Sequence, residues 1–248
     1  MKLSKSTLAL LACACACVST VCSAAPATVT IRFDNPIYNG SGFDTVNINS
    51  PAGSSNVNAS RFQGTASNLV GIDASIFVDD INDVYMYCYD LYQTIGALEV
   101  VNYTINFNGA FARTLNFLGA VNGVMNAASP SPVNDPYAWL HPVDGAQGAA
   151  IQLGIWESRY DSSGWDLGAG SFTATGLENT TNGYWNSFKA AIGAYASLDP
   201  ATVMVFESAT RQDMIAGDPP LAVPEPGSLA LLGAGLAGLA LARRRRIL

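Results

Sequence analysis

The sequence predicts an α+β fold, in which a β-rich sheet or barrel portion packs against a few helices. Segments in which apolar and polar residues alternate occur near both ends of the body of the chain, and segments with helical periodicity lie between them. With 49% apolar and 12% charged residues, the composition is that of a folded chain and not of a disordered one. We expect a signal peptide and an apolar C-terminal helix to flank this body.

The first 25 residues have the three-part layout of a secretory signal peptide. A basic start with Lys2 and Lys5 precedes an apolar run at 8–21, and small residues follow at 23–25. A lipoprotein signal ending at Cys13 is an alternative, although few residues precede that cysteine. We therefore expect export from the cytoplasm, with residues 26–222 forming one extracellular domain.

Four strands are predicted in the body. Residues 28–34 alternate and are rich in β-branched residues, which favours a strand. Turn residues follow, above all at 39–42 and 51–55. Aromatic and β-branched residues alternate along 84–95 and 98–107, which we expect to be neighbouring strands of one sheet. Residues 202–207 are the fourth predicted strand, closing the body.

Three helices are predicted between residues 113 and 198. Leu115, Leu118, Val121 and Met125 recur at helical spacing, which indicates a helix over 113–126. Asp144 can cap the next helix, predicted over 145–160. The third is predicted over 182–198, where Asp199-Pro200 ends it.

The charge of the body argues against nucleic acid as a partner. Half of the twelve basic residues lie in the terminal segments. The body keeps six basic residues against eighteen acidic ones, and this field repels phosphate backbones. The basic residues of the body are Arg32, Arg61, Arg113, Arg159, Lys189 and Arg211.

Cys88 is the one cysteine outside the N-terminal apolar segment, which holds the other four. It can be a small buried apolar residue among aromatic neighbours. It can form an intermolecular disulfide in an oxidising compartment. A third interpretation makes it a nucleophile that reacts with a glutamine of the same chain.

The third interpretation depends on a resemblance. Tyr87-Cys88-Tyr89-Asp90 is followed about sixty residues later by the stretch 150–157, which contains Gln152 and Trp156. This arrangement resembles the thioester domains of bacterial surface adhesins, which have an aromatic-Cys-x-Asp stretch and a later Thr-Gln-x-Ala-Ile-Trp stretch. Ile151 and Gly154 depart from that pattern. The resemblance covers about residues 85–160. It implies a thioester between Cys88 and Gln152, supported by Tyr87, Tyr89, Asp90, Trp156 and Glu157.

The chemistry implied by this resemblance is a single-use reaction. The sulfur of Cys88 would attack the side-chain carboxamide of Gln152, and ammonia would leave. An amine from another surface, such as a lysine, would then attack the thioester and join the two partners through an amide. We expect no cofactor. We also expect no enzymatic activity, other than at most a single-turnover reaction in which the protein forms its own thioester.

The C-terminal tail has three parts in a fixed order. Val223-Pro224-Glu225-Pro226 precedes an apolar segment at about 227–242, and Arg243-Arg244-Arg245-Arg246 follows. About sixteen residues span about 24 Å as a helix, somewhat less than the hydrocarbon core of about 30 Å. A plain membrane anchor is one interpretation.

The same tail closely resembles the PEP-CTERM sorting signal of Gram-negative bacteria. This resemblance implies an exosortase-like processing protease as partner, transient inner-membrane anchoring, and cleavage near Pro-Glu-Pro. The protein would then reach the cell surface or the extracellular matrix. Many proteins with such tails carry a motif like that at 150–157, which indicates a shared domain.

Three functions remain open from the sequence. The first is a covalent adhesin at the surface or in a biofilm, and the second is a passive exopolysaccharide-associated matrix protein in which Cys88 is inert. The third is a secreted hydrolase that uses acidic residues such as Glu157 and Asp161. No metal site is expected, because His141 precedes Pro142 without evident partners and the acidic run at 79–83 lacks the spacing of a known calcium loop.

Overall fold

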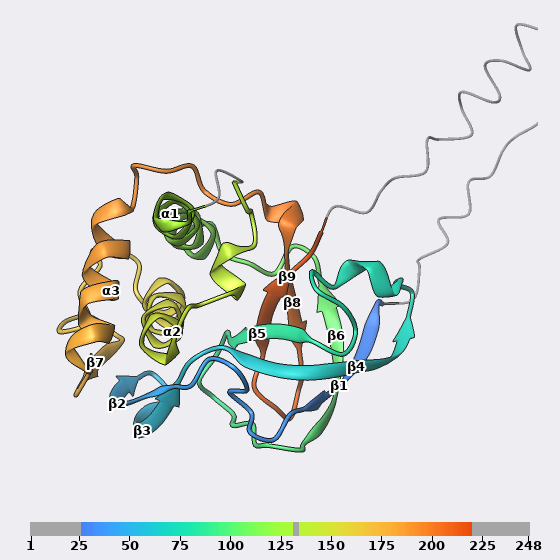
Figure 1. The fold of residues 1–248 in the computed structure, drawn as a ribbon. Coiled ribbons are helices and arrows are strands. Elements are labelled where there is room, and N and C mark those ends of the chain that lie inside the picture. Colours follow the sequence, from blue (N-terminus) through green and yellow to red (C-terminus); the bar gives the residue numbers. More distant parts are fainter. Residues whose placement is uncertain (1–25, 131–133, 220–248) are drawn as a thin grey trace, which may run out of the picture.

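The computed structural model describes residues 26–130 and 134–219. Its centre is a closed antiparallel barrel of six strands in the order β1-β4-β5-β9-β8-β6 (Figure 1). The strands of the barrel are β1 (Thr28–Phe33), β4 (Phe62–Val70), β5 (Val84–Cys88), β6 (Val100–Asn106), β8 (Val203–Glu207) and β9 (Met214–Gly217). Closure pairs every strand on both sides, so the barrel presents no long free edge.

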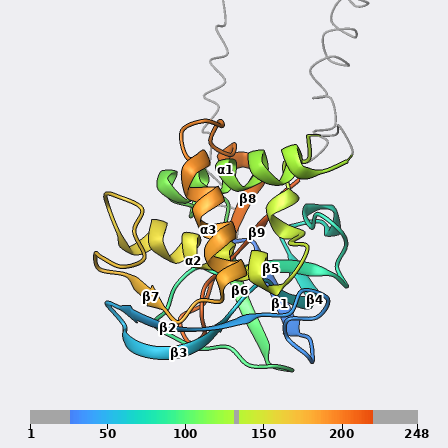
Figure 2. The ribbon, with the colours of Figure 1, turned by 60° about the vertical axis from the view of Figure 1, so that its left-hand side comes forward.

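Three helices and a smaller sheet lie beside the barrel (Figures 1 and 2). The helices are α1 (Ala112–Ala128), α2 (Gly145–Tyr160) and α3 (Asn179–Ala191), and each packs against the other two. The smaller sheet has the order β3-β2-β7, built from β2 (Asp44–Ser50), β3 (Gly53–Ala59) and β7 (Thr173–Thr175). Short 3₁₀ helices occur at η1 (Ala74–Ile76), η2 (Ala138–Leu140) and η3 (Pro200–Thr202).

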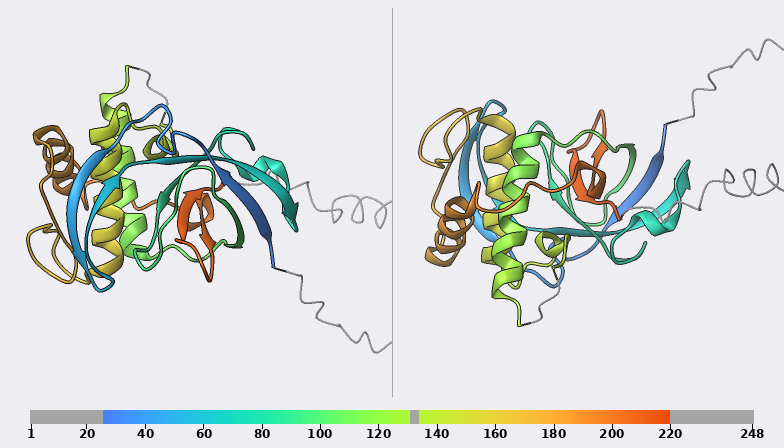
Figure 3. Two further views of the ribbon diagram at one scale, coloured as in Figure 1. Left: turned by 90° about the horizontal axis from the view of Figure 1, so that it is seen from below. Right: turned by 90° about the horizontal axis from the view of Figure 1, so that it is seen from above.

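Helix α2 joins the two parts of the molecule. It contacts the helices α1 and α3 and also the strands β2, β3 and β5, and α1 runs beside it in both views of Figure 3. Every residue from 147 to 158 is buried. Gly154 allows the close approach of α1, because a Cβ atom there would lie 1.9 Å from Cζ of Phe117. A helix with so little exposed surface is held by packing on all sides.

Several predictions are confirmed by the structure. The α+β class with a barrel portion is found. The strands expected at 28–34, 98–107 and 202–207 correspond to β1, β6 and β8, and the first predicted helix corresponds to α1. The prediction for α2 is confirmed at both ends: the Asp144 carboxylate caps it by accepting a hydrogen bond from the Gln147 N–H at 2.7 Å.

The turns expected near 39–42 and at 51–52 are found, but the strands between and after them were not predicted. The N-terminal part contains β2, β3 and β4, and β3 begins at Gly53, inside a segment expected to be a turn. Buried positions alternate with exposed ones along β2, but only two of the four buried residues, Val46 and Ile48, are apolar. Pairing along the full length of β2 and β3 compensates for the low strand propensity of Asn, Ser and Gly. Strand β9 was also not predicted.

Two further predictions need correction. The strand expected over 84–95 ends at Cys88, and β5 is separated from β6 on both sides of the barrel by other strands. The helix expected over 182–198 spans Asn179–Ala191 instead. Gly193 follows with a φ of 84°, a conformation that is typical beyond a helix end and that glycine adopts without strain.

The expected signal peptide and the expected tail lie outside the described residues. This includes the predicted membrane segment at about 227–242 and both tail motifs. Among the helices of the described part, none has both the length and the apolar character needed to cross a membrane.

Candidate functional site

Cys88 is the last residue of β5, at the point where the barrel meets α2. Its side chain is 2% exposed, and the thiol is free. On the neighbouring strand β9, Met214 lies opposite Cys88 in the register. The residues just before β9 therefore come close to the end of β5 and to the thiol.

Gln152 lies beside Cys88, as the sequence predicted, but its hydrogen bonds go to the main chain. Its Oε1 accepts from the Cys88 N–H at 2.8 Å, and its Nε2 donates to the Cys88 carbonyl at 2.8 Å. The side-chain amide thus pairs with Cys88 as a residue of a neighbouring strand would. Because Gln152 is fully buried, loss of this amide would leave two main-chain groups unpaired.

The thiol itself contacts a different glutamine, Gln212. The Cys88 S–H donates to Oε1 of Gln212, with 3.0 Å between sulfur and oxygen. The Nε2 of Gln212 donates to the Asp90 carbonyl at 2.7 Å, which fixes which end of the amide faces the sulfur. A C=O bond is about 1.2 Å long, so Cδ of Gln212 lies within about 4.2 Å of the sulfur.

Gln212 was not among the residues predicted for the site. It lies 124 residues after Cys88, in a loop before a short strand that the sequence pattern did not indicate. Its main-chain carbonyl accepts from the Tyr103 hydroxyl at 3.1 Å, which also holds this loop to the barrel. The pairing of β5 with β9 would have predicted this contact, because it brings Gln212 next to Cys88.

The thiol is neutral in this environment. Burial raises the pKa of Cys88 well above its usual value, and the Asp90 carboxylate raises it further. A protonated thiol agrees with its role as the donor to Gln212. Burial also raises the pKa of Asp90 to about 6, with the Asp213 carboxylate adding to the effect.

A cavity of about 240 Å³ is lined in part by Cys88. Three residues of the candidate site contribute to its wall, namely Cys88, Gln212 and Trp156. The opposite walls come from the 91–95 loop, from β3, and from Tyr38 and Phe62. A small molecule or a side chain in this cavity would therefore lie next to Cys88 and Gln212.

The other predicted supporting residues have different roles. Tyr87 stacks on Trp139 and donates its hydroxyl to the Trp139 carbonyl at 3.1 Å. The Tyr89 hydroxyl accepts from the Phe111 N–H at 2.8 Å. Both rings fill the core, and neither lines the cavity beside Cys88.

Glu157 belongs to a separate buried cluster. Its Oε1 accepts from the Asp166 N–H at 3.0 Å and lies 3.8 Å from Nη2 of Arg113. Burial raises the pKa of Glu157 to about 7, and the nearby Asp161 carboxylate contributes. Glu157 and Asp161 do not line the cavity beside Cys88.

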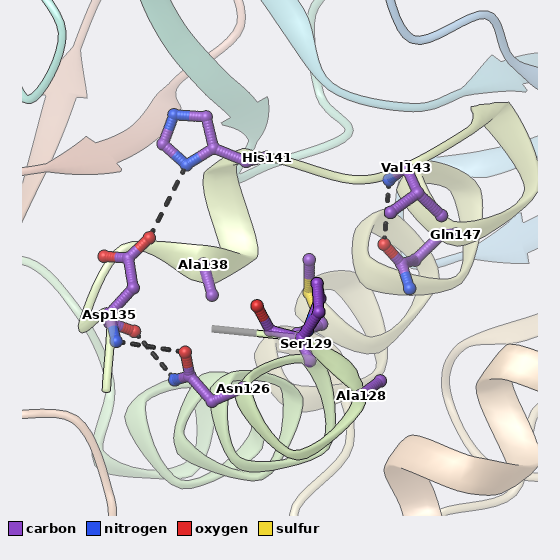
Figure 4. Close-up of a pocket in the computed structure, with 10 residues that line it drawn as sticks. Asn126, Ala128, Ser129, Asp135, Ala138, His141, Val143 and Gln147 are labelled. Atoms are coloured by element: carbon purple, nitrogen blue, oxygen red, sulfur yellow. Dashed lines mark hydrogen bonds and ion pairs between the residues drawn. The ribbon is translucent and has the colours of Figure 1, made fainter. Parts of the chain in front are cut away.

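A larger cavity of about 520 Å³ lies away from the cysteine, between the end of α1 and the start of α2. Figure 4 shows His141 and Asn126 directed towards Asp135 at its edge, and Gln147 bonded to the Val143 N–H. Its wall combines apolar residues such as Met125 and Val143 with polar ones such as Gln147. The free thiol of Cys88 favours the smaller cavity as the candidate site.

No metal site is evident in the part of the chain that the structure describes. No group of three His, Cys, Asp or Glu side chains there could hold an ion. Nε2 of His141 lies 3.2 Å from Oδ2 of Asp79, and Asp83 accepts from Nε2 of Gln63 at 2.7 Å. These residues of the acidic run are thus engaged in contacts within the protein.

Comparison with known proteins identifies the tail. Residues 222–246 match the PEP-CTERM protein-sorting motif. The chain carries a PEP-CTERM signal. This signal implies export and sorting by an exosortase, as the residues Val223 to Pro226 and Arg243 to Arg246 predicted. No curated protein and no solved structure matches the chain, and the PEP-CTERM match covers the tail.

Proposed function

We propose that the exported body forms an internal thioester and attaches covalently to an amine on another surface. The carrying observation is the 3.0 Å contact between the Cys88 sulfur and Oε1 of Gln212. This contact favours Gln212 as the acyl donor over Gln152, whose amide is committed to the main chain of Cys88. Gln152 then acts as a positioning residue that holds the end of β5.

The first step joins the two side chains. The Cys88 sulfur attacks Cδ of Gln212 and forms a C–S bond, while the C–N bond to Nε2 breaks. The thiol proton moves to the departing nitrogen, which leaves as ammonia, so no further reactant is needed. The buried thiol is neutral, which slows its attack on the amide. The fixed contact with Gln212 counteracts this, because proximity can lower the activation barrier by several kcal/mol.

The second step transfers the acyl group. An amine nitrogen attacks Cδ of Gln212, a new C–N bond forms, and the C–S bond breaks. The amine proton passes to sulfur, and Cys88 becomes a thiol again. Cys88 is 2% exposed, so water or an amine would reach a thioester there only through the cavity that Cys88 lines.

The biological role proposed from this chemistry is a single-use adhesin or matrix protein. Export by the PEP-CTERM route would place the body where amines of proteins or amino sugars are available. The burial of Cys88 equally supports a passive matrix protein with an inert cysteine, so the test must separate these two. The hydrolase interpretation has weaker support, because Glu157 and Asp161 line neither the cavity beside Cys88 nor the larger cavity between α1 and α2.

The test is an intact mass of the full chain, purified after export in a buffer without amines. We expect a mass lower by one ammonia than the processed sequence, and full mass for Cys88→Ala and Gln212→Ala. Treatment with methylamine followed by peptide mapping identifies the donor, because the methylamide forms on the reacting glutamine. Methylamide on Gln152 would overturn the choice of Gln212. Full mass and a thiol that reacts only after denaturation would leave the passive matrix protein.

A further inference from the structure

In the described part of the chain, the small sheet has a long open edge. Its strand order is β3-β2-β7, and β3 pairs with β2 alone among the described strands, whereas the strands of the barrel are paired on both sides. Figure 2 shows β3 below β2, near the lower margin of the molecule. The other edge strand, β7, has three residues, so the seven residues of β3 form the longer edge.

Three residues of β3 direct their main-chain groups to the open side. A two-residue turn joins β2 to β3, so the first pair of the ladder exchanges both hydrogen bonds, and such pairs then alternate. The N–H and carbonyl groups of Ser54, Asn56 and Asn58 therefore point away from β2. The Tyr38 hydroxyl agrees with this direction, since it donates to the Asn58 carbonyl at 3.0 Å. Within the described residues, the outward groups of Ser54 and Asn56 bond to no other element.

This edge lacks the features by which proteins usually prevent pairing with other chains. Such features are charged side chains, proline and β-bulges. Strand β3 contains no charged residue and no proline, and its register with β2 runs without a shift over all seven residues. Its residues other than Ala59 are exposed or partly exposed. A regular and accessible edge of this kind is a template for an added strand.

The cavity lined by Cys88 lies at one face of this edge. Ser55 and Val57 of β3 also line the cavity. They pair with the buried residues Ile48 and Val46 of β2, so the side chains of these pairs share one face of the sheet. In an added strand, the residues opposite Ser55 and Val57 would place their side chains on that same face, next to the cavity.

We propose that the edge of β3 binds an extended, lysine-bearing peptide of a partner protein as an antiparallel strand. The lysine lies opposite Ser55 or Val57 and its side chain enters the cavity, while its two neighbours exchange main-chain hydrogen bonds with β3. A basic partner fits the charge of the body, which has eighteen acidic residues against six basic ones. Delivery of the amine to Cys88 rests on the proposed thioester, whereas docking of the strand does not.

Docking is measured by fluorescence anisotropy on the full chain carrying Cys88→Ala, which cannot form a thioester. The probe is a labelled peptide in which threonine alternates with valine and with one central lysine. Methylation of the main-chain nitrogens of the two threonines beside the lysine removes donors that face β3, and should weaken binding about tenfold or more. Methylation of the two valine nitrogens, which face away from β3, should leave the affinity within about twofold.

Two variants of Asn56 test the strand itself. Asn56→Pro removes an outward N–H, and an edge strand tolerates proline where the nitrogen faces solvent. Asn56→Ala is the matched control, because it loses the same side chain and keeps the N–H. We expect Asn56→Pro to weaken the peptide about tenfold or more and Asn56→Ala to stay within about twofold. Unchanged circular dichroism shows that both variants keep the fold.

The outcomes separate docking from the chemistry at Cys88. Equal binding of the two methylated peptides, or equal binding by the two Asn56 variants, overturns the docking site. A wild-type dimer that Asn56→Pro dissociates in sedimentation also overturns it, because a second copy would then occupy the edge.

Delivery of the lysine is tested on the wild type by intact mass. We expect the thioester form to gain the mass of one peptide. An ammonia deficit without this gain refutes delivery of the lysine by the docked strand. Absence of the ammonia deficit refutes the thioester, and the binding measured with Cys88→Ala still decides the docking site.

Discussion

The buried carboxyl of Glu157 should make the stability of the body depend on pH. Its side chain is 1% exposed, and Oε2 has no hydrogen-bond partner among the described residues. Burial raises its pKa from 4.5 to about 7 in the folded state. The protonated form therefore stabilises the fold below about pH 4.5. This contribution decreases as the pH rises, and it is lost once the pH passes the folded pKa.

The size of the effect follows from the pKa difference, since one pKa unit corresponds to about 1.4 kcal/mol. Between pH 4.5 and 8, ionisation of Glu157 should lower the free energy of unfolding by roughly 3 kcal/mol. Glu157→Gln replaces the acid by a neutral amide of the same shape. We expect this variant to lose that part of the pH dependence and to be more stable than the wild type at pH 8.

The assay is urea denaturation at several pH values between 4.5 and 8, for the wild type and for Glu157→Gln. The exposed residue Glu178, changed to Gln, is a matched control and should keep the wild-type pH dependence. Asp90 and Asp218 also have raised pKa values, so the difference between wild type and variant is the quantity to compare. Parallel curves for the wild type and Glu157→Gln would refute the reasoning.

Three further predictions concern helix α2. Gly154→Ala should lower the free energy of unfolding by about 1–3 kcal/mol, because the added methyl group clashes with Phe117. Adding Phe117→Leu to this variant should recover part of the loss. An unchanged denaturation midpoint for Gly154→Ala would contradict the packing. Gln152→Leu should cost roughly 2–5 kcal/mol, because two buried main-chain groups of Cys88 lose their partner, and a melting temperature within error of wild type would exclude this role. Asp144→Ala should cost about 1 kcal/mol in denaturant melts while Asp144→Asn retains most of the cap, and equal losses in both variants would argue against capping.

The sequence predicts the elements whose local signals agree with their packing. Helix α2 combines a capping aspartate with a continuous buried run, and its bounds could be stated to the residue. The strands β2 and β3 are built largely from Asn, Ser and Gly, so their pairing depends on partners that no local pattern reveals. The four-residue strand β9 is too short to show a period.

Only part of the candidate site could be predicted from the sequence. The nearness of Cys88 and Gln152 could be inferred from two motifs, and the structure places their amide and main-chain groups in contact. The contact of the sulfur with Gln212 could not, because it depends on how β9 pairs with β5. Barrel closure is a property of the whole chain and leaves no trace around residue 212.

The chain order of the barrel also determines when the site can assemble. Strand β9 lies between β5 and β8, and it is the last strand of the barrel in the sequence. Until β9 pairs with it, β5 has an unpaired edge, and Gln212, two residues before β9, is not held beside Cys88. The proposed thioester could therefore form only after the last strand of the barrel is in place.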